Sequence, residues 1–257
     1  YQWQTDASYL ITGGLGELGL LVAQWMATQG ARHIVLLGRS PLPLRAAWAS
    51  VDVDSPTAQR IRAIEALEQQ GAQVYLAYAD VADEDQVSAA IATVEAEGCP
   101  PIRGVCHMAV VPHPLPPLQQ LAAATLTHVF KPKVYGSWWL HRHFAESPLD
   151  FFVLFSSWAG LLGEVGQQIG GYSMANTFLD ALAHHRQSLG QSALSINWCD
   201  WAEIGMRSRY VRQGYQLLPE NWTLQPTQGL QSLKQLLPTA AAQVAVLPVH
   251  RSENFQL

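Results

Sequence analysis

Tyr172 and Asn176 are the residues of this sequence whose types and spacing most directly suggest chemistry. In a helix that begins near residue 172, these positions lie one turn apart on the same face, so both side chains can reach one site. Ser156 and Ser157 close the apolar stretch DFFVLFSS, which reads as a strand. Because open parallel sheets bind ligands at the carboxyl ends of their strands, the serines and the tyrosine are candidates for a common site.

A tyrosine hydroxyl is a useful proton donor only when a neighbouring group orients it and lowers its pKa. The chain has three lysines, Lys131, Lys133 and Lys234, and the first two lie in FKPKVYG, ahead of the strand that carries the serines. A nearby ammonium group favours the phenolate and lowers the pKa of a tyrosine. The residues alone leave both Lys131 and Lys133 open for this role.

The segment YLITGGLGELGL predicts a dinucleotide site. Gly14, Gly16 and Gly19 form a GxGxxG pattern directly after a predicted strand and at the start of a predicted helix. Glycines in this setting permit a tight turn and a close approach of the backbone to a pyrophosphate, which the helix N-terminus stabilises. The alternative, a purely structural turn, is less consistent with the strand-turn-helix context.

The ends of the second and third predicted strands indicate which dinucleotide is bound. Arg39 and Ser40 in LLGRS offer a cation and a hydroxyl to a 2′-phosphate, where an NAD-binding protein would present a carboxylate. In ADVAD, Asp80 could face the adenine or cap the next helix, and Val81 could pack on the ring. We therefore predict NADPH as the cofactor, with a solvated surface role for Arg39 as the alternative.

Alternation of short apolar runs with segments of helical period predicts the element order of an α/β fold. We expect a Rossmann-like, doubly wound parallel sheet with helices on both faces and a C-terminal lid. The predicted strands lie in SYLIT, HIVLLG, QVYLAYAD, RGVCHMAV, DFFVLFSS, SALSINW and AQVAVLPV. Residues 41–56 read as a surface insertion and residues 202–225 as the lid region. Residues 1–257 are expected to form a single domain cut from a longer polypeptide.

Composition narrows the classes of partner. Of the 257 residues, 49% are hydrophobic and 14% are charged, and the net charge of -5 is spread without a basic patch, so neither nucleic acid nor a membrane is an expected partner. The three cysteines lack CxxC spacing, which favours a reducing, cytoplasmic setting and no metal site.

Taken together, seven segments resemble the ketoreductase domain of modular type I polyketide synthases, a branch of the short-chain dehydrogenase/reductase superfamily. They are YLITGGLGELG, HIVLLGRS, ADVAD, FKPKVYG, LDFFVLFSSWAG, GGYSMANTFLDALAHHR and INWCDWAEIGM. The resemblance covers nearly the whole chain but only the catalytic subdomain; the family's structural subdomain is expected upstream. It implies NADPH-dependent reduction of a β-ketoacyl thioester on an acyl carrier protein, with that carrier and the other synthase domains as partners.

The resemblance also implies roles for individual residues. Tyr172 would be the proton donor and Ser157 would hydrogen-bond the substrate carbonyl. Lys133, which fits the family pattern better than Lys131, would lower the pKa of Tyr172, and Asn176 would hold relay water and help to place the lysine. The implied cofactor contacts are Thr12, Gly14, Leu15, Gly16, Leu18, Gly19, Arg39, Ser40, Asp80 and Val81.

Departures from the family pattern keep a second function open. Two residues more than the family pattern separate Ser157 from Tyr172, and Val110 replaces a glycine that lets the nicotinamide ribose approach the backbone. Cys199 replaces the glycine of WGxW, and PHP at 112–114 stands in place of an LDD that marks one alcohol stereochemistry, which favours the opposite, A-type outcome. The alternative is a reduction-incompetent ketoreductase-like domain that serves as a scaffold or an α-epimerase.

Overall fold

The computed structural model describes residues 1–111, 118–161, 170–212 and 223–248. Its main sheet has seven parallel strands in the order β3-β2-β1-β4-β5-β6-β9. The strands are β1 (Ser8–Thr12), β2 (His33–Gly38), β3 (Gln73–Tyr78), β4 (Ile102–His107), β5 (Phe151–Ser157), β6 (Leu194–Trp198) and β9 (Gln243–Val246). This order confirms the predicted Rossmann-like α/β fold.

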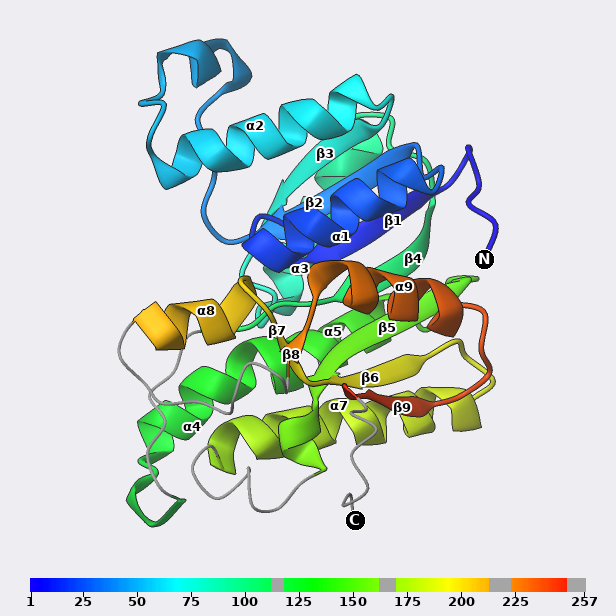
Figure 1. Ribbon diagram of the computed structural model, residues 1–257. Helices are drawn as coiled ribbons and strands as arrows, with labels where there is room; N and C mark the ends of the chain where they lie inside the picture. Colours follow the sequence, from blue (N-terminus) through cyan, green and yellow to red (C-terminus); the bar gives the residue numbers. More distant parts are fainter. Residues whose placement is uncertain (112–117, 162–169, 213–222, 249–257) are drawn as a thin grey trace.

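Helices cover both faces of the sheet, as Figure 1 shows. Helices α1 (Glu17–Thr28), α2 (Pro56–Gln69) and α9 (Pro226–Leu236) pack on one face. Helices α3 (Glu84–Ala96), α5 (Gly136–His143) and α7 (Gly170–Ser188) pack on the other. Every residue of β1 and β5 is buried, which explains why these central strands appear in the sequence as continuous apolar runs.

Several helix boundaries follow from local sequence signals. The Ser55 hydroxyl accepts a hydrogen bond from Ala58 N and Pro56 occupies the first turn, so α2 begins there. Asp83 caps α3 in the same way through Gln86 N. These caps place the amino ends of α2 and α3 at the same edge of the sheet as the carboxyl ends of the strands.

The segment predicted as an insertion is folded against α2. It contains a 3-10 helix, η1 (Arg45–Ser50), in which Trp48 is buried and donates its indole N–H to Pro43 O at 2.8 Å. The Arg45 guanidinium lies over the Trp48 ring at 4.7 Å and pairs with Glu68 of α2 at 2.7 Å. Figure 1 shows this segment at the outer edge of the molecule, next to α2.

Part of the predicted lid is described. Strand β7 (Asp200–Trp201) precedes the predicted lid and pairs with β8 (Thr223–Leu224), which lies near the end of it. Between them, α8 (Gly205–Arg212) begins at a glycine with φ +78°. Residues 213–222 of the predicted lid lie outside the described part of the chain, as do residues 112–114 of the stereochemical motif.

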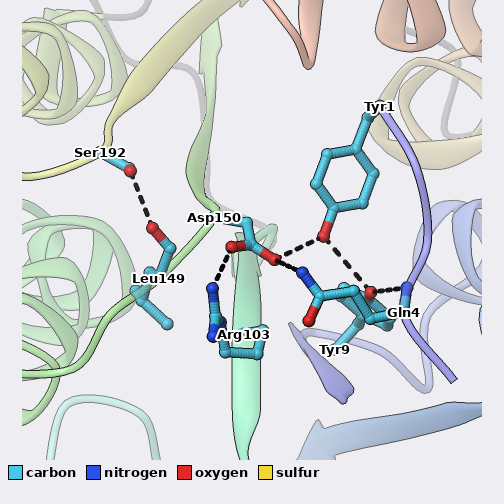
Figure 2. A network of polar contacts seen from close by, with 7 residues as sticks. All are labelled: Tyr1, Gln4, Tyr9, Arg103, Leu149, Asp150 and Ser192. Carbon is cyan, nitrogen blue, oxygen red and sulfur yellow. Dashed lines mark hydrogen bonds and ion pairs between the residues drawn. The ribbon is translucent and has the colours of Figure 1, made fainter. Parts of the chain in front are cut away.

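The N-terminal segment is held at the amino ends of the strands, opposite the strand ends that bear the serines. Figure 2 shows the Tyr1 hydroxyl and the Gln4 side chain both donating to Asp150, which also pairs with Arg103. Burial and the neighbouring Tyr9 and Asp150 raise the pKa of Tyr1.

Among the helices that the structure describes, none is long and apolar enough to cross a membrane.

Candidate active site

A cavity of about 420 Å³ lies where the carboxyl ends of the strands meet. Its walls come from the β1–α1 loop, from the ends of β2 to β6, from α7 and from α8. The predicted residues that line it are Leu15, Gly16, Leu18, Gly19, Arg39, Ser40, Asp80, Val81, Lys133, Ser157 and Tyr172. Three others, Thr12, Gly14 and Asn176, lie outside that lining.

Tyr172 enters this cavity from the first turn of α7, close to the predicted start of that helix. Burial raises the pKa of Tyr172 to about 12, while hydrogen bonds with the side chains of Asn176 and Ser157 act in the opposite direction. The two additional residues between the serine and the tyrosine were predicted within GQQIGGY, 166–172, of which 166–169 lie outside the described part of the chain. The Ser157 hydroxyl nevertheless lies within hydrogen-bonding reach of Tyr172.

The two adjacent serines have different surroundings. Ser157 ends β5, and its hydroxyl accepts a hydrogen bond from Ala159 N at 3.2 Å as the chain turns into η4 (Trp158–Gly160). The Ser156 hydroxyl donates to Asn176 O at 3.3 Å and accepts from Asn197 Nδ2 at 3.0 Å. Ser156 is therefore tied to α7 and β6, and Ser157 is the serine that contacts Tyr172.

Lys133, and not Lys131, lies beside the tyrosine. It belongs to a π-helical turn, η3 (Lys131–Tyr135), between α4 (Ala123–Phe130) and α5. The Lys133 side chain is only 3% exposed; its Nζ donates to Phe155 O at 2.9 Å and lies 5.4 Å from the centre of the Tyr172 ring. Lys131 is exposed at the rim of the same cavity.

The electrostatic relation between these two groups differs from the sequence-based expectation. The resemblance implies that Lys133 lowers the pKa of Tyr172, yet the net shift of Tyr172 is upward. Burial also lowers the pKa of Lys133 to about 7, with Asp180 opposing the shift. Since burial disfavours both charged forms, Tyr172 is neutral near neutral pH, and Lys133 loses its proton far more easily than an exposed lysine does.

Asn176 is fully buried one turn after Tyr172. Its Nδ2 donates to Tyr172 O at 2.7 Å, and its Oδ1 has no hydrogen-bond partner within the described part of the chain. A further turn along α7, Asp180 accepts hydrogen bonds from Ser195 Oγ at 2.5 Å and Asn197 Nδ2 at 2.9 Å. Sequence reasoning missed Asp180, although its spacing of four from Asn176 was a usable signal.

The glycine loop has the close contacts that its motif predicts. A Cβ on Gly19 would lie 2.5 Å from Gly13 O, and a Cβ on Gly14 would lie 2.7 Å from Ile11 O. Only glycine fits at these positions without a shift of the backbone. Gly14 is therefore required by the turn itself, whereas Gly16 and Gly19 also line the cavity.

Thr12, which the resemblance implies as a cofactor contact, is not among the residues that line the cavity. Its side chain is fully buried; its hydroxyl lies 2.8 Å from His107 Nδ1 and accepts hydrogen bonds from the backbone N–H groups of Met108 and Ala109. Through these hydrogen bonds, the Thr12 side chain joins the carboxyl end of β1 to the carboxyl end of β4. Burial, with the nearby Lys133, lowers the pKa of His107 to about 3, so the imidazole is neutral.

The far end of the cavity fits a dinucleotide phosphate. Gly16 is the N-cap of α1, whose first-turn N–H groups and helix dipole favour an anion, and Arg39 and Ser40 line the same cavity. Asp80 does not cap α3: its Oδ1 accepts from Ala82 N at 3.1 Å in a local turn. Val110, which is 37% exposed, also lines the cavity.

Several cavity residues were not anticipated from the sequence. Asp200 of β7 and Arg207 of α8 form an ion pair at 3.0 Å, and Glu17 accepts a hydrogen bond from Gly205 N at 3.1 Å. Burial raises the pKa of Asp200, and Arg207 opposes the shift. These contacts join the start of α8 to the glycine loop and to β7. They could not be predicted from a local sequence pattern, because the two residues of each pair come from separate segments of the chain. Arg60 of α2 also lines the cavity.

Comparison with known proteins gives consistent matches. The KR domain family model matches residues 7–203. The chain is 43% identical to 6-methylsalicylic acid synthase of Aspergillus niger over 201 residues, which cover 78% of this chain and 11% of that protein. It is 42% identical to 5-methyl-1-naphthoate synthase of Streptomyces sahachiroi over 203 residues, covering 78% of this chain and 11% of that protein.

Solved structures agree. An A-type ketoreductase from a modular polyketide synthase matches with a TM-score of 0.76 and 35% identity, covering 94% of this chain and 47% of its own. The ketoreductase of the first module of phoslactomycin biosynthesis in Streptomyces sp. HK803 matches with a TM-score of 0.78 and 32% identity, covering 97% and 55%. The chain thus spans 11% of these curated relatives and about half of these solved chains. With residues 7–203 matched, it belongs to the KR domain family, the ketoreductase domains of polyketide synthases.

Proposed function

We propose that this domain reduces a β-ketoacyl thioester, carried on an acyl carrier protein, to the β-hydroxyacyl thioester with NADPH. The observation that carries the proposal is the arrangement of Tyr172, Ser157 and Lys133 around one cavity whose other end is formed by the glycine loop and Arg39. Matched relatives are much longer synthases of which this chain covers 11%, which supports a carrier protein and further synthase domains as partners.

The chemistry assigned to these residues follows from their surroundings. NADPH, when bound, supplies a hydride to the β-carbon of the substrate. The Ser157 hydroxyl orients the carbonyl, and the Tyr172 hydroxyl, kept protonated at neutral pH by its raised pKa, gives its proton to the developing oxyanion. In the substrate, the C=O π bond breaks while a C–H bond and an O–H bond form. The hydride donor would be oxidised to NADP⁺, and loss of the O–H proton would leave Tyr172 as a phenolate.

Lys133 is placed to stabilise that phenolate. Its Nζ lies 5.4 Å from the centre of the Tyr172 ring, and a negative charge there favours protonation of the lysine. Because burial lowers the pKa of Lys133, its neutral amine can take up a proton from solvent water once the phenolate forms, and that proton can then be passed to Tyr172 to restore the hydroxyl.

The test measures reduction of a diffusible β-ketoacyl thioester, monitored by the decrease in NADPH absorbance. We expect turnover by the wild-type domain and a loss of about 100-fold or more in Tyr172→Phe. The matched control is Tyr135→Phe, because Tyr135 is an exposed tyrosine of η3 and should be replaceable without loss of rate.

The second candidate function is a scaffold or an α-epimerase without reductase activity, and the position of Val110 in the cavity wall favours it. A folded wild-type domain that binds no NADPH would support this candidate and overturn the reductase. NADPH binding together with Tyr172-dependent turnover would exclude the scaffold.

A further inference from the structure

One end of the cavity carries two arginines from different elements. Arg39 and Ser40 follow β2, Asp80 follows β3, and Arg60 lies in the second turn of α2, which connects these two strands. Because β2 and β3 are neighbours in the sheet, their carboxyl ends and the start of α2 meet here. Arg60 lies 21 positions after Arg39, so no local motif joins them.

These two guanidinium groups differ from the other arginines near α2. Arg45 donates to both oxygens of Glu68, at 2.7 and 3.0 Å, and Arg62 donates to Val53 O at 2.8 Å. Neither Arg39 nor Arg60 has a hydrogen bond or an ion pair with any described residue. Two cations that have no partner among the described residues and line one cavity next to a hydroxyl form a site suited to an anion.

The backbone around Arg60 is firmly held. Ala58, Ile61 and Ile64 are buried on the face of α2 that packs against the sheet. The Arg45–Glu68 pair ties the preceding segment to the last turn of α2, and Leu42 N donates to the Tyr78 hydroxyl at 3.2 Å. The backbone of Arg60 is therefore ordered before a ligand binds, so that binding has to order only its side chain.

We propose that Arg60 is a second cationic ligand for the 2′-phosphate of NADPH and, together with Arg39 and Ser40, sets the preference for NADPH over NADH. This inference rests on the proposed function. A guanidinium presents several N–H donors in a fixed plane and suits phosphate oxygens, so two arginines and one hydroxyl can together satisfy a dianionic phosphate.

Binding measurements on Arg60→Met test this role separately from catalysis. Dissociation constants for NADPH, NADH and 2′,5′-ADP are measured by calorimetry. We expect NADPH and 2′,5′-ADP to bind about 10- to 100-fold more weakly to the variant, because a charge-assisted hydrogen bond is lost, and NADH to bind as it does to the wild type. Unchanged NADH affinity also shows that the variant is folded. The matched control, Arg62→Met on the same helix, should leave all three constants unchanged.

Each other result has a definite meaning. Equal weakening of NADPH and NADH would place Arg60 against the adenine or the pyrophosphate and overturn the inference. A wild type that prefers NADPH and an Arg60→Met variant with the same preference would overturn the inference and leave the proposed function standing. A wild-type domain that binds neither NADPH nor 2′,5′-ADP would overturn both this inference and the proposed reductase function.

Discussion

Lys133 is a buried lysine in the wall of the cavity, and the burial of its ammonium group opposes folding. It is nearly fully buried, its Nζ donates to Phe155 O, and Asp180 only partly offsets the effect of burial on its pKa. A lysine that is easily deprotonated can exchange a proton with a neighbouring phenolate. The same burial disfavours the ammonium form in the folded state.

Lys133→Met should therefore make the domain more stable at low pH and inactive as a reductase. The pKa of Lys133 is about 7 in the folded state and 10.5 ordinarily, so between these values the unfolded chain binds more protons and the free energy of unfolding of the wild type rises with pH. The variant lacks this contribution. Its advantage over the wild type should be on the order of 5 kcal/mol at pH 6, because each unit of the pKa difference corresponds to about 1.4 kcal/mol, and it should shrink toward pH 10.

Urea denaturation of both proteins across this pH range measures the difference. Lys131→Met, which changes an exposed lysine of the same turn, should show no such pH-dependent gap. A gap for Lys133→Met that stays constant from pH 6 to pH 10 would contradict the lowered pKa.

At the scale of elements, α9 supports the cavity through a contact that admits only glycine. Gly229 is buried against Trp201, and a Cβ there would lie 2.3 Å from Cη2 of the indole. Trp201 in turn lines the cavity and belongs to β7, next to the Asp200–Arg207 pair. The close approach of helix and indole thus sets the position of one wall.

Gly229→Ala should destabilise the domain by about 1 to 3 kcal/mol and weaken NADPH binding. Helix propensity alone predicts the opposite sign, a gain of up to about 1 kcal/mol, so the sign of the measured change shows which effect prevails. Chemical denaturation and NADPH titration provide the two measurements. Gln231→Ala, at an exposed position of α9, is the control, and a stabilising Gly229→Ala would refute the packing argument.

At the scale of the whole molecule, the cavity and the polar network of the N-terminal segment lie at opposite ends of the sheet. The cavity lies at the carboxyl ends of the strands, and the Tyr1–Asp150–Arg103 network lies at their amino ends (Figure 2). The network joins the N-terminal segment to the starts of β4 and β5, and Trp3 packs edge-on against Tyr9 beside it. The network fixes the N-terminal segment to the sheet, and none of its residues lines the cavity.

Asp150→Asn should cost about 1 to 3 kcal/mol of stability, because the partly buried Arg103 and Tyr1 lose a charged acceptor. NADPH affinity should remain at the wild-type value. Thermal unfolding and NADPH titration check both statements, with Asp6→Asn in the same N-terminal segment as the control. A parallel loss of NADPH affinity would show that the two ends of the sheet are coupled.

The sequence by itself determined the fold class, the glycine loop and the residue types of the site. These follow from local rules: buried parallel strands need continuous apolar runs, the turn after β1 admits only glycine at Gly14 and Gly19, and Tyr172 and Asn176 share a helix face because of their spacing. The family pattern added a preference for Lys133 over Lys131.

Only the tertiary structure decided which separate segments meet. It placed Lys133 rather than Lys131 beside Tyr172, turned Thr12 toward His107, and brought Arg60 into the cavity with Arg39. It also set the direction of each pKa shift, because burial and neighbouring charges depend on packing between elements distant in the chain. These contacts cannot be predicted from spacing along the sequence, because they form only when the sheet and its helices pack together around the site.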